Sequence, residues 1–140
     1  NIESLPQECI NDLKEAMEKT AHNEKCTLTL ALSYSAKWEI VNAAKKIAAA
    51  VKNNNLDIND IDENLFSSQL TTVNIPDPEL MIRTSGEHRI SNYLLWQMAY
   101  TEFYFTDVLW PDFRRENLFE AIVDYQKRER RFGKISEQLN

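Results

Sequence analysis

Apolar side chains recur every three or four residues in five stretches of the chain, which is the spacing of helices that bury one face. These stretches span residues 4–21, 38–51, 56–70, 91–100 and 112–125. In the first we expect Ser4 to cap a helix, with Pro6 in its first turn and a narrow apolar stripe that covers a sheet. Asp112 is the candidate cap of the last. The apolar stripe of the second stretch consists of Trp38, Val41, Ala44, Ala48 and Val51.

Three shorter stretches, residues 26–32, 80–83 and 102–105, have the composition of β-strands. Residues 26–32 alternate strictly between larger apolar and smaller side chains. Helices that separate strands imply right-handed crossovers. The pattern therefore predicts an α/β fold, in which a mostly parallel sheet has helices on both faces. A length of 140 residues suits one core, so we expect a single domain over residues 1–140.

Residues 83–92 read RTSGEHRISN and follow the second predicted strand. Arg83 and Arg89 flank a small loop, and Ser91 lies where a helix could begin. Two guanidinium groups, a hydroxyl and the N–H groups of a helix start together suit a phosphate or diphosphate. Open α/β sheets place their ligands at this end of their strands. The other interpretation is a polar turn whose arginines are solvated.

Charge, missing motifs and cysteine spacing exclude several other classes of protein and site. The net charge is −6, and such an acidic chain is a poor general binder of nucleic acid. All seven arginines nevertheless lie at or after position 83. The chain contains neither a G-x-G-x-x-G nor a Walker-type loop, and no apolar run of the length needed to span a bilayer. Cys9 and Cys26 lack metal-ligand spacing, so we expect reduced, buried thiols in a cytoplasmic protein.

Residues 76–97, PDPELMIRTSGEHRISNYLLWQ, closely resemble the signature of the cis-prenyltransferases. Upstream, SYSAKWEI at residues 33–40 is similar to a diverged form of another stretch of that family. The resemblance covers nearly the whole chain and continues through residues 99–106, 110–113 and 130–133.

The resemblance implies a transferase that condenses isopentenyl diphosphate with an allylic diphosphate such as farnesyl diphosphate. The product would be a cis-polyprenyl diphosphate, in bacteria the undecaprenyl carrier of cell-wall precursors. By the matching motif, Arg83, Arg89 and Ser91 would hold the diphosphate of isopentenyl diphosphate, and Ile90 would contribute through its backbone. The resemblance also implies a homodimer and peripheral membrane contact through the lipid product.

The resemblance further implies Mg²⁺ as cofactor, with Glu102 as its associated residue and His88 close enough to assist. Without the family resemblance, the sequence would indicate only that Glu102 is a surface residue of a strand.

One departure limits what these 140 residues can be expected to do. The family's leading Asp-Gly-Asn-Gly-Arg motif is absent, so the chain resembles the C-terminal half of a cis-prenyltransferase fold, a partial domain. We therefore expect no catalytic residue in this part and no activity from it alone. The alternative is a non-catalytic partner or dimerisation module, in which the basic tail at residues 128–131 could cross to a neighbour. The charged residues 127–131 are either a solvated helix end or an arm laid against a partner.

Overall fold

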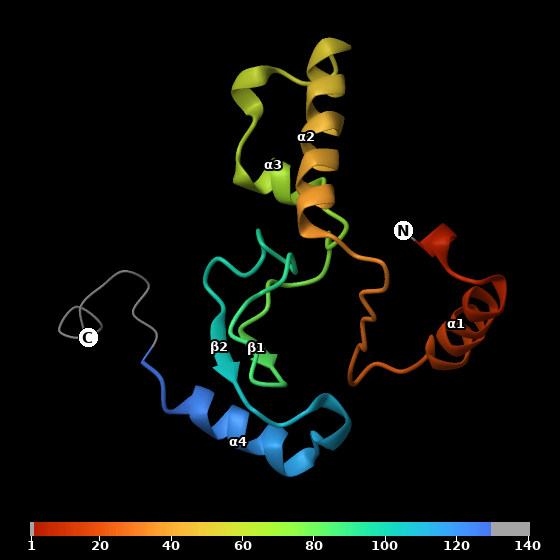
Figure 1. Cartoon of the computed structure of the whole chain (residues 1–140). Coiled ribbons are helices and arrows are strands. Elements are labelled where there is room, and N and C mark those ends of the chain that lie inside the picture. Colours follow the sequence, from red (N-terminus) through yellow and green to blue (C-terminus); the bar gives the residue numbers. More distant parts are fainter. Residues whose placement is uncertain (1, 130–140) are drawn as a thin grey trace. The chain divides into compact units, whose positions relative to one another are not determined.

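A computed structural model describes residues 2–129 of the chain (Figure 1). The chain divides into two compact units, Asn1–Ser35 and Ala36–Asn140, and each is described by itself. The motif at residues 130–133 lies outside the described residues.

The first unit contains a short 3₁₀ helix, Ile2–Ser4, and the helix α1, Gln7–Thr20 (Figure 1). The helix is confirmed, but the predicted cap is wrong. Pro6 occupies the N-cap position without a side-chain hydrogen bond, and the Ser4 hydroxyl bonds that of Ser33 at 3.3 Å. No residue of α1 is buried, so the expected covered face is not observed. Cys9 and Cys26 are free thiols, as expected, but both are exposed.

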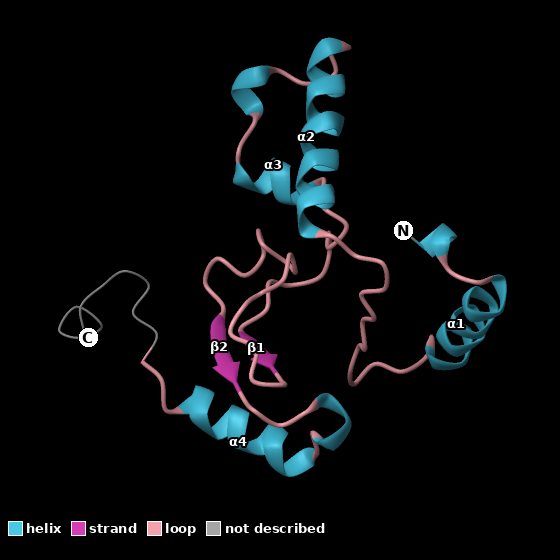
Figure 2. Cartoon of the chain, viewed as in Figure 1, coloured by secondary structure: helices cyan, strands magenta, loops and turns pink. Residues whose placement is uncertain are grey.

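The strand predicted over residues 26–32 does not form, and Figure 2 shows this stretch as a loop. Leu28, Leu30 and Leu32 are exposed, Leu28 to 82% of its surface. A strand is stabilised by hydrogen bonds to a neighbouring strand and by burial of at least one face. In the described part of the chain residues 26–32 belong to no sheet, so this stretch lacks the inter-strand hydrogen bonds that define a strand.

The second unit begins with α2, Ala36–Lys52, followed by the 3₁₀ helix Ile58–Asp60 and the short helix α3, Glu63–Ser68 (Figure 1). These elements confirm the helices predicted there. Asp62 caps α3 by accepting a hydrogen bond from the Leu65 N–H at 2.7 Å. The buried face of α2, however, is not the predicted stripe, since Trp38 and Val41 are exposed. The buried residues of α2 are Ala36, Glu39, Ala43 and Ile47.

The sheet has two strands, β1 (Leu80–Arg83) and β2 (Glu102–Phe105). They pair in parallel, with Leu80 opposite Glu102 and Arg83 opposite Phe105, which confirms the predicted parallel arrangement. The third strand, predicted over residues 26–32, does not form. The helix α4, Arg115–Gln126, contacts β2 (Figures 1 and 2).

Residues 91–100 were expected to form the helix between the two strands, and this prediction is wrong. The chain makes successive turns there instead. Ser91, Asn92 and Leu94 have φ angles of 48°, 61° and 44°, in the left-handed region, which a right-handed helix cannot contain. Met98 is still buried, as the apolar spacing predicted.

The start of α4 also differs from expectation. Asp112 was the candidate cap, but it belongs to a separate 3₁₀ helix, Trp110–Asp112. The N-cap of α4 is Arg114, whose backbone N–H donates to Asn117 Oδ1 at 2.9 Å.

Candidate diphosphate and cation site

The loop after β1 is fixed by backbone hydrogen bonds to the chain that follows β2. The N–H of Thr106 donates to the Arg83 carbonyl at 2.9 Å, and those of Ser85 and Gly86 donate to Val108 and Thr106 at 2.9 and 3.0 Å. Gly86 has φ 65°, and an added Cβ would lie 3.0 Å from Asp107 Oδ1. Glycine therefore suits both the conformation and the space at this turn. These hydrogen bonds continue the pairing of the two strands into the first part of the loop.

Arg83 lies at the carboxyl end of β1, as predicted, and is half-buried. Its Nε–H is buried and donates to no acceptor among the described residues. A buried donor without an acceptor costs about 1–3 kcal/mol, so native proteins rarely leave one. A ligand oxygen at this position would relieve that cost.

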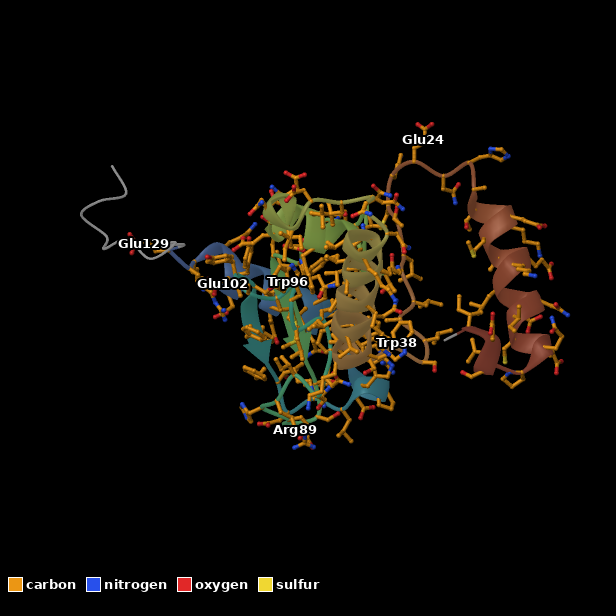
Figure 3. The ribbon with its side chains drawn as sticks, turned by 90° about the horizontal axis from the view of Figure 1, so that it is seen from above. Glu24, Trp38, Arg89, Trp96, Glu102 and Glu129 are labelled. Carbon is orange, nitrogen blue, oxygen red and sulfur yellow. The ribbon has the colours of Figure 1, made fainter. Side chains whose placement is uncertain are left out.

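Arg89 lies further along the same loop and is largely solvent-accessible, with 67% of its side chain exposed. It forms an ion pair with Glu87, and Figure 3 shows it pointing away from the ribbon. His88 packs instead against Phe105 at the end of β2, with ring centroids 4.9 Å apart. Arg83 therefore ends β1 with a half-buried side chain, whereas Arg89 lies on the loop after it with an exposed one.

Ile90 is half-buried, and Ser91 is exposed in a left-handed conformation. The helix start that was expected to supply N–H groups at Ser91 is therefore absent. The next residue has a role that the sequence analysis missed. The Asn92 carbonyl accepts from the Ala36 N–H at 3.1 Å, and its Oδ1 accepts from the Lys37 N–H at 2.8 Å.

Asn92 thus satisfies the first turn of α2 from a position 55 residues away. Asparagine tolerates the left-handed region better than most residues, and this tolerance is the only local signal that could have suggested the role.

Trp96 and Gln97, at the end of the arginine motif, have structural contacts. The Trp96 indole N–H donates to Ser67 Oγ at 2.9 Å, and its ring lies 4.4 Å from that of Phe66. Gln97 donates to the buried carboxylate of Glu39 at 3.1 Å. A cavity of about 210 Å³ lies beside these residues, and its lining includes neither Arg83 nor any other predicted site residue.

Glu102 lies at the amino end of β2, whereas Arg83 lies at the carboxyl end of β1. The register separates them by three residue positions, which is about 10 Å along the strands. Figure 3 shows Glu102 and Arg89 well apart. Glu102 and Arg83 therefore lie at opposite ends of the paired strands.

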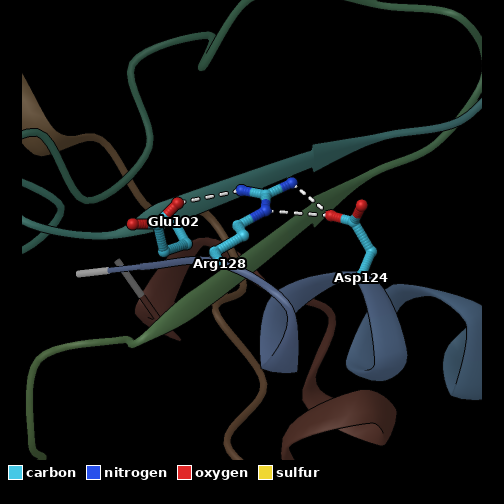
Figure 4. A network of polar contacts seen from close by, with 3 residues as sticks. All are labelled: Glu102, Asp124 and Arg128. Carbon is cyan, nitrogen blue, oxygen red and sulfur yellow. Dashed lines mark hydrogen bonds and ion pairs between the residues drawn. The ribbon is translucent and has the colours of Figure 1, made fainter.

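Glu102 belongs to a network with Arg128 and Asp124 (Figure 4). Arg128 Nη1 donates to Glu102 Oε2 at 2.9 Å, while Nε donates to Asp124 Oδ2 at 2.9 Å and Nη2 also bonds that oxygen. The hydrogen bond that Arg128 donates to Glu102 is the main cause that raises the pKa of Arg128; Asp124 adds to it and burial opposes it. Arg128 therefore stays a cation, and the two carboxylates share its charge.

The donor chemistry at Glu102 fits Mg²⁺ as one ligand among several. Mg²⁺ is commonly held by one or two carboxylates together with substrate phosphates and water. Glu102 Oε2 is used by Arg128, but Oε1 accepts no hydrogen bond from the described residues. Over residues 2–129 there is no group of three or more His, Cys, Asp or Glu that could hold a metal by itself.

No helix within residues 2–129 combines the length and the apolar character needed to cross a bilayer.

Comparison with known proteins supplies the family. Residues 1–133 match the family model described as "Putative undecaprenyl diphosphate synthase". The chain is 55% identical over 139 residues to the isoprenyl transferase of Chlorobaculum tepidum, covering 99% of this chain and 52% of that protein. It is 51% identical over 132 residues to the isoprenyl transferase of Bacillus subtilis, and this match covers 94% of this chain and 51% of that protein. The chain thus spans about half the length of these curated relatives.

A solved structure agrees with the sequence match. It is the structure of lavandulyl diphosphate synthase from Lavandula x intermedia in complex with dimethylallyl diphosphate. That protein is 40% identical to this chain, and the two structures superpose with a TM-score of 0.89. The match covers 96% of this chain and 58% of the other. The helices and the two-stranded parallel sheet therefore match part of the cis-prenyltransferase fold. The chain belongs to the isoprenyl transferase, or undecaprenyl diphosphate synthase, family.

Proposed function

We propose that the chain is part of a prenyltransferase that condenses isopentenyl diphosphate with an allylic diphosphate, such as farnesyl diphosphate, to make cis-polyprenyl diphosphate. Family membership supports this reaction class. The relative solved with dimethylallyl diphosphate supports a prenyl diphosphate ligand for the shared fold. The chain would carry the isopentenyl diphosphate half-site.

The observation that carries this proposal is the buried Nε–H of Arg83, which has no acceptor among the described residues. A diphosphate oxygen beside it would accept a charge-assisted hydrogen bond. Arg89 would then close on the same diphosphate from the exposed side of the loop, with Ser91 and the backbone of Ile90. Arg89 first has to leave Glu87. An exposed ion pair contributes only about 0–1 kcal/mol, less than the roughly 1.5–3 kcal/mol of a charged hydrogen bond, so the exchange favours the ligand.

When bound, Mg²⁺ would offset the negative charge of the allylic diphosphate as it leaves. In this chain Glu102 would contribute one carboxylate oxygen, Oε1, to hold it. In this proposal Glu102 and Arg83, which lie at opposite ends of the paired strands, act on different groups. Arg83 and Arg89 orient the isopentenyl diphosphate, and Glu102 serves the cation.

No residue of this chain is assigned to the chemical step. The Asp-Gly-Asn-Gly-Arg stretch of the family is absent from the sequence, so we propose that the 140 residues alone do not transfer prenyl groups. The homodimer, the peripheral membrane contact and the cytoplasmic location stay predictions.

Isothermal titration of the chain with isopentenyl diphosphate tests the half-site. Arg83→Ala and Arg89→Ala should each weaken binding by about 1.5–3 kcal/mol, which is roughly 10- to 150-fold. Arg115→Ala is the matched control, because Arg115 is an exposed arginine of α4 with only a 3.7 Å contact to its neighbour Glu116. Equal affinity of all four proteins would refute the half-site and favour a non-catalytic partner subunit.

A further inference from the structure

We propose that Arg128 is a positioning residue for Glu102, holding one carboxylate oxygen so that the other is presented to a divalent cation. This inference rests on the proposed function, because it assumes that Glu102 serves the cation. Arg128 contacts neither substrate nor cation in this scheme and acts only through Glu102.

The geometry of the guanidinium carries the proposal. One edge nitrogen, Nη1, bonds Glu102 Oε2 at 2.9 Å, while Nε and Nη2 both bond Asp124 Oδ2 (Figure 4). A planar guanidinium bound on two sides cannot rotate without breaking a charge-assisted bond. Glu102 is consequently attached to a group that is itself fixed to α4.

Glu102 would otherwise have little to orient it. It is the first residue of β2, and its side chain remains 30% exposed. Among the described residues, Arg128 is the only one that donates a hydrogen bond to the Glu102 carboxylate. Ligating carboxylates are usually held by hydrogen bonds from an outer residue, and loss of such a residue typically costs 10- to 100-fold in metal affinity or activity.

The charge of Arg128 raises the opposite possibility, that it competes with a cation for Glu102. Asp124 argues against this. Its carboxylate is bonded to the same guanidinium through two nitrogens, so Arg128 and Asp124 together act on a cation as a neutral pair. The three side chains carry a net charge of −1 (two carboxylates and one guanidinium), which still attracts a divalent cation.

Paramagnetic broadening by Mn²⁺ tests the proposal in the ¹⁵N-labelled chain, with Mn²⁺ alone as the probe. The backbone amide signals of residues 101–103 report on the vicinity of Glu102. Glu102→Gln should remove their selective broadening. Arg128→Ala should require about 10- to 100-fold more Mn²⁺ for the same broadening. Arg128→Lys keeps the charge but cannot bond both carboxylates as a planar fork, so it should lie nearer to Arg128→Ala than to wild type.

Two further variants protect the test against a folding artefact. Asp124→Asn leaves the Arg128–Glu102 contact in place and removes a charge from its anchor, so its effect should be smaller than that of Arg128→Ala. Arg115→Ala, on the same helix, should match wild type. All variants are compared by their amide spectra before Mn²⁺ is added. In the whole protein, Arg128→Ala should raise the Mg²⁺ concentration for half-maximal rate while leaving the KM for isopentenyl diphosphate unchanged.

The outcomes separate this inference from the function on which it rests. Unchanged broadening in Glu102→Gln would refute the assigned role of Glu102, and the positioning role with it. Loss of broadening in Glu102→Gln, together with a wild-type response of Arg128→Ala, would refute the positioning role alone. A tighter response of Arg128→Ala, or a wild-type response of Arg128→Lys, would also overturn it, since the first indicates competition and the second a purely electrostatic effect.

Discussion

Residues 26–32 and β1 both have strand-like sequences, yet only β1 forms a strand. The first stretch is the longer of the two and has the cleaner alternation of side chains. Its leucines are nonetheless exposed, and it is paired with no strand in the described chain. β1 has four residues, all half-buried, in register with β2. The difference shows that alternation specifies which side chains share a face, whereas pairing with a neighbouring strand decides whether a strand exists.

The contrast extends to function. The strand that pairs is the one that carries Arg83 and the loop after it, and three backbone hydrogen bonds to residues 106 and 108 continue the pairing into that loop. A diphosphate half-site needs donors held in place before the ligand arrives. The backbone hydrogen bonds of residues 83–86 hold the first part of the loop, next to Arg83, in this way.

The largest expected difference between the two stretches is in amide hydrogen exchange. The N–H groups of Glu102 and Thr106 donate to carbonyls of the β1 segment at 3.0 and 2.9 Å, whereas no backbone bond of this kind is made by Thr27 or Thr29. Glu102 and Thr106 should therefore exchange about 100-fold or more slowly than Thr27 and Thr29, after correction for intrinsic rates. Similar protection in both stretches, measured by NMR, would show that residues 26–32 are paired in solution.

The helices α1 to α4 were predictable because their signals are local, although the same kind of spacing wrongly predicted a helix over residues 91–100. The apolar spacing located α1, α2, α3 and α4, since three or four residues are enough to define a helical face. The choice of buried face on α2 was not local. Ala36, Glu39, Ala43 and Ile47 are buried instead of the Trp38 stripe, because Glu39 accepts hydrogen bonds from Thr71 and Gln97 far along the chain.

Of the candidate site, the position of Arg83 in the fold was predictable, whereas its role stays a prediction. Arg83 lies at the strand end that its sequence indicated, because the strand and the turn after it are encoded within a few residues. The arrangement around Glu102 could not be derived in this way, since Arg128 is 26 residues away and reaches Glu102 only through the packing of α4 on β2. The family resemblance selected Glu102, but it carried no information on what orients its carboxylate.

Substitution of Asn92 is expected to have an intermediate effect on stability, because Asn92 connects the end of the arginine loop to the start of α2 by hydrogen bonds. Asn92→Ala removes the hydrogen bond to the Lys37 N–H and places alanine at φ 61°, so it should destabilise the chain by about 0.5–2 kcal/mol in chemical unfolding. Asn92→Gly loses the same side-chain hydrogen bond and keeps the same backbone carbonyl, but glycine adopts this φ without strain. The difference in stability between the two variants therefore measures the backbone strain. Wild-type stability of Asn92→Ala would mean that this contact does not persist in solution.

The smallest effect is expected at Leu28, and it provides the sharpest form of the comparison. Leu28→Ala and Leu70→Ala are the same substitution at positions that are 82% and 3% exposed. Truncation of Leu70 should cost about 2–5 kcal/mol, because it removes buried methyl groups and leaves a cavity. Truncation of Leu28 should change the free energy of unfolding by less than about 0.5 kcal/mol, as at other exposed positions. Denaturant titrations of the two variants measure both values. A cost above about 1 kcal/mol for Leu28→Ala would mean that its side chain is covered in solution and that the alternating stretch forms its strand after all.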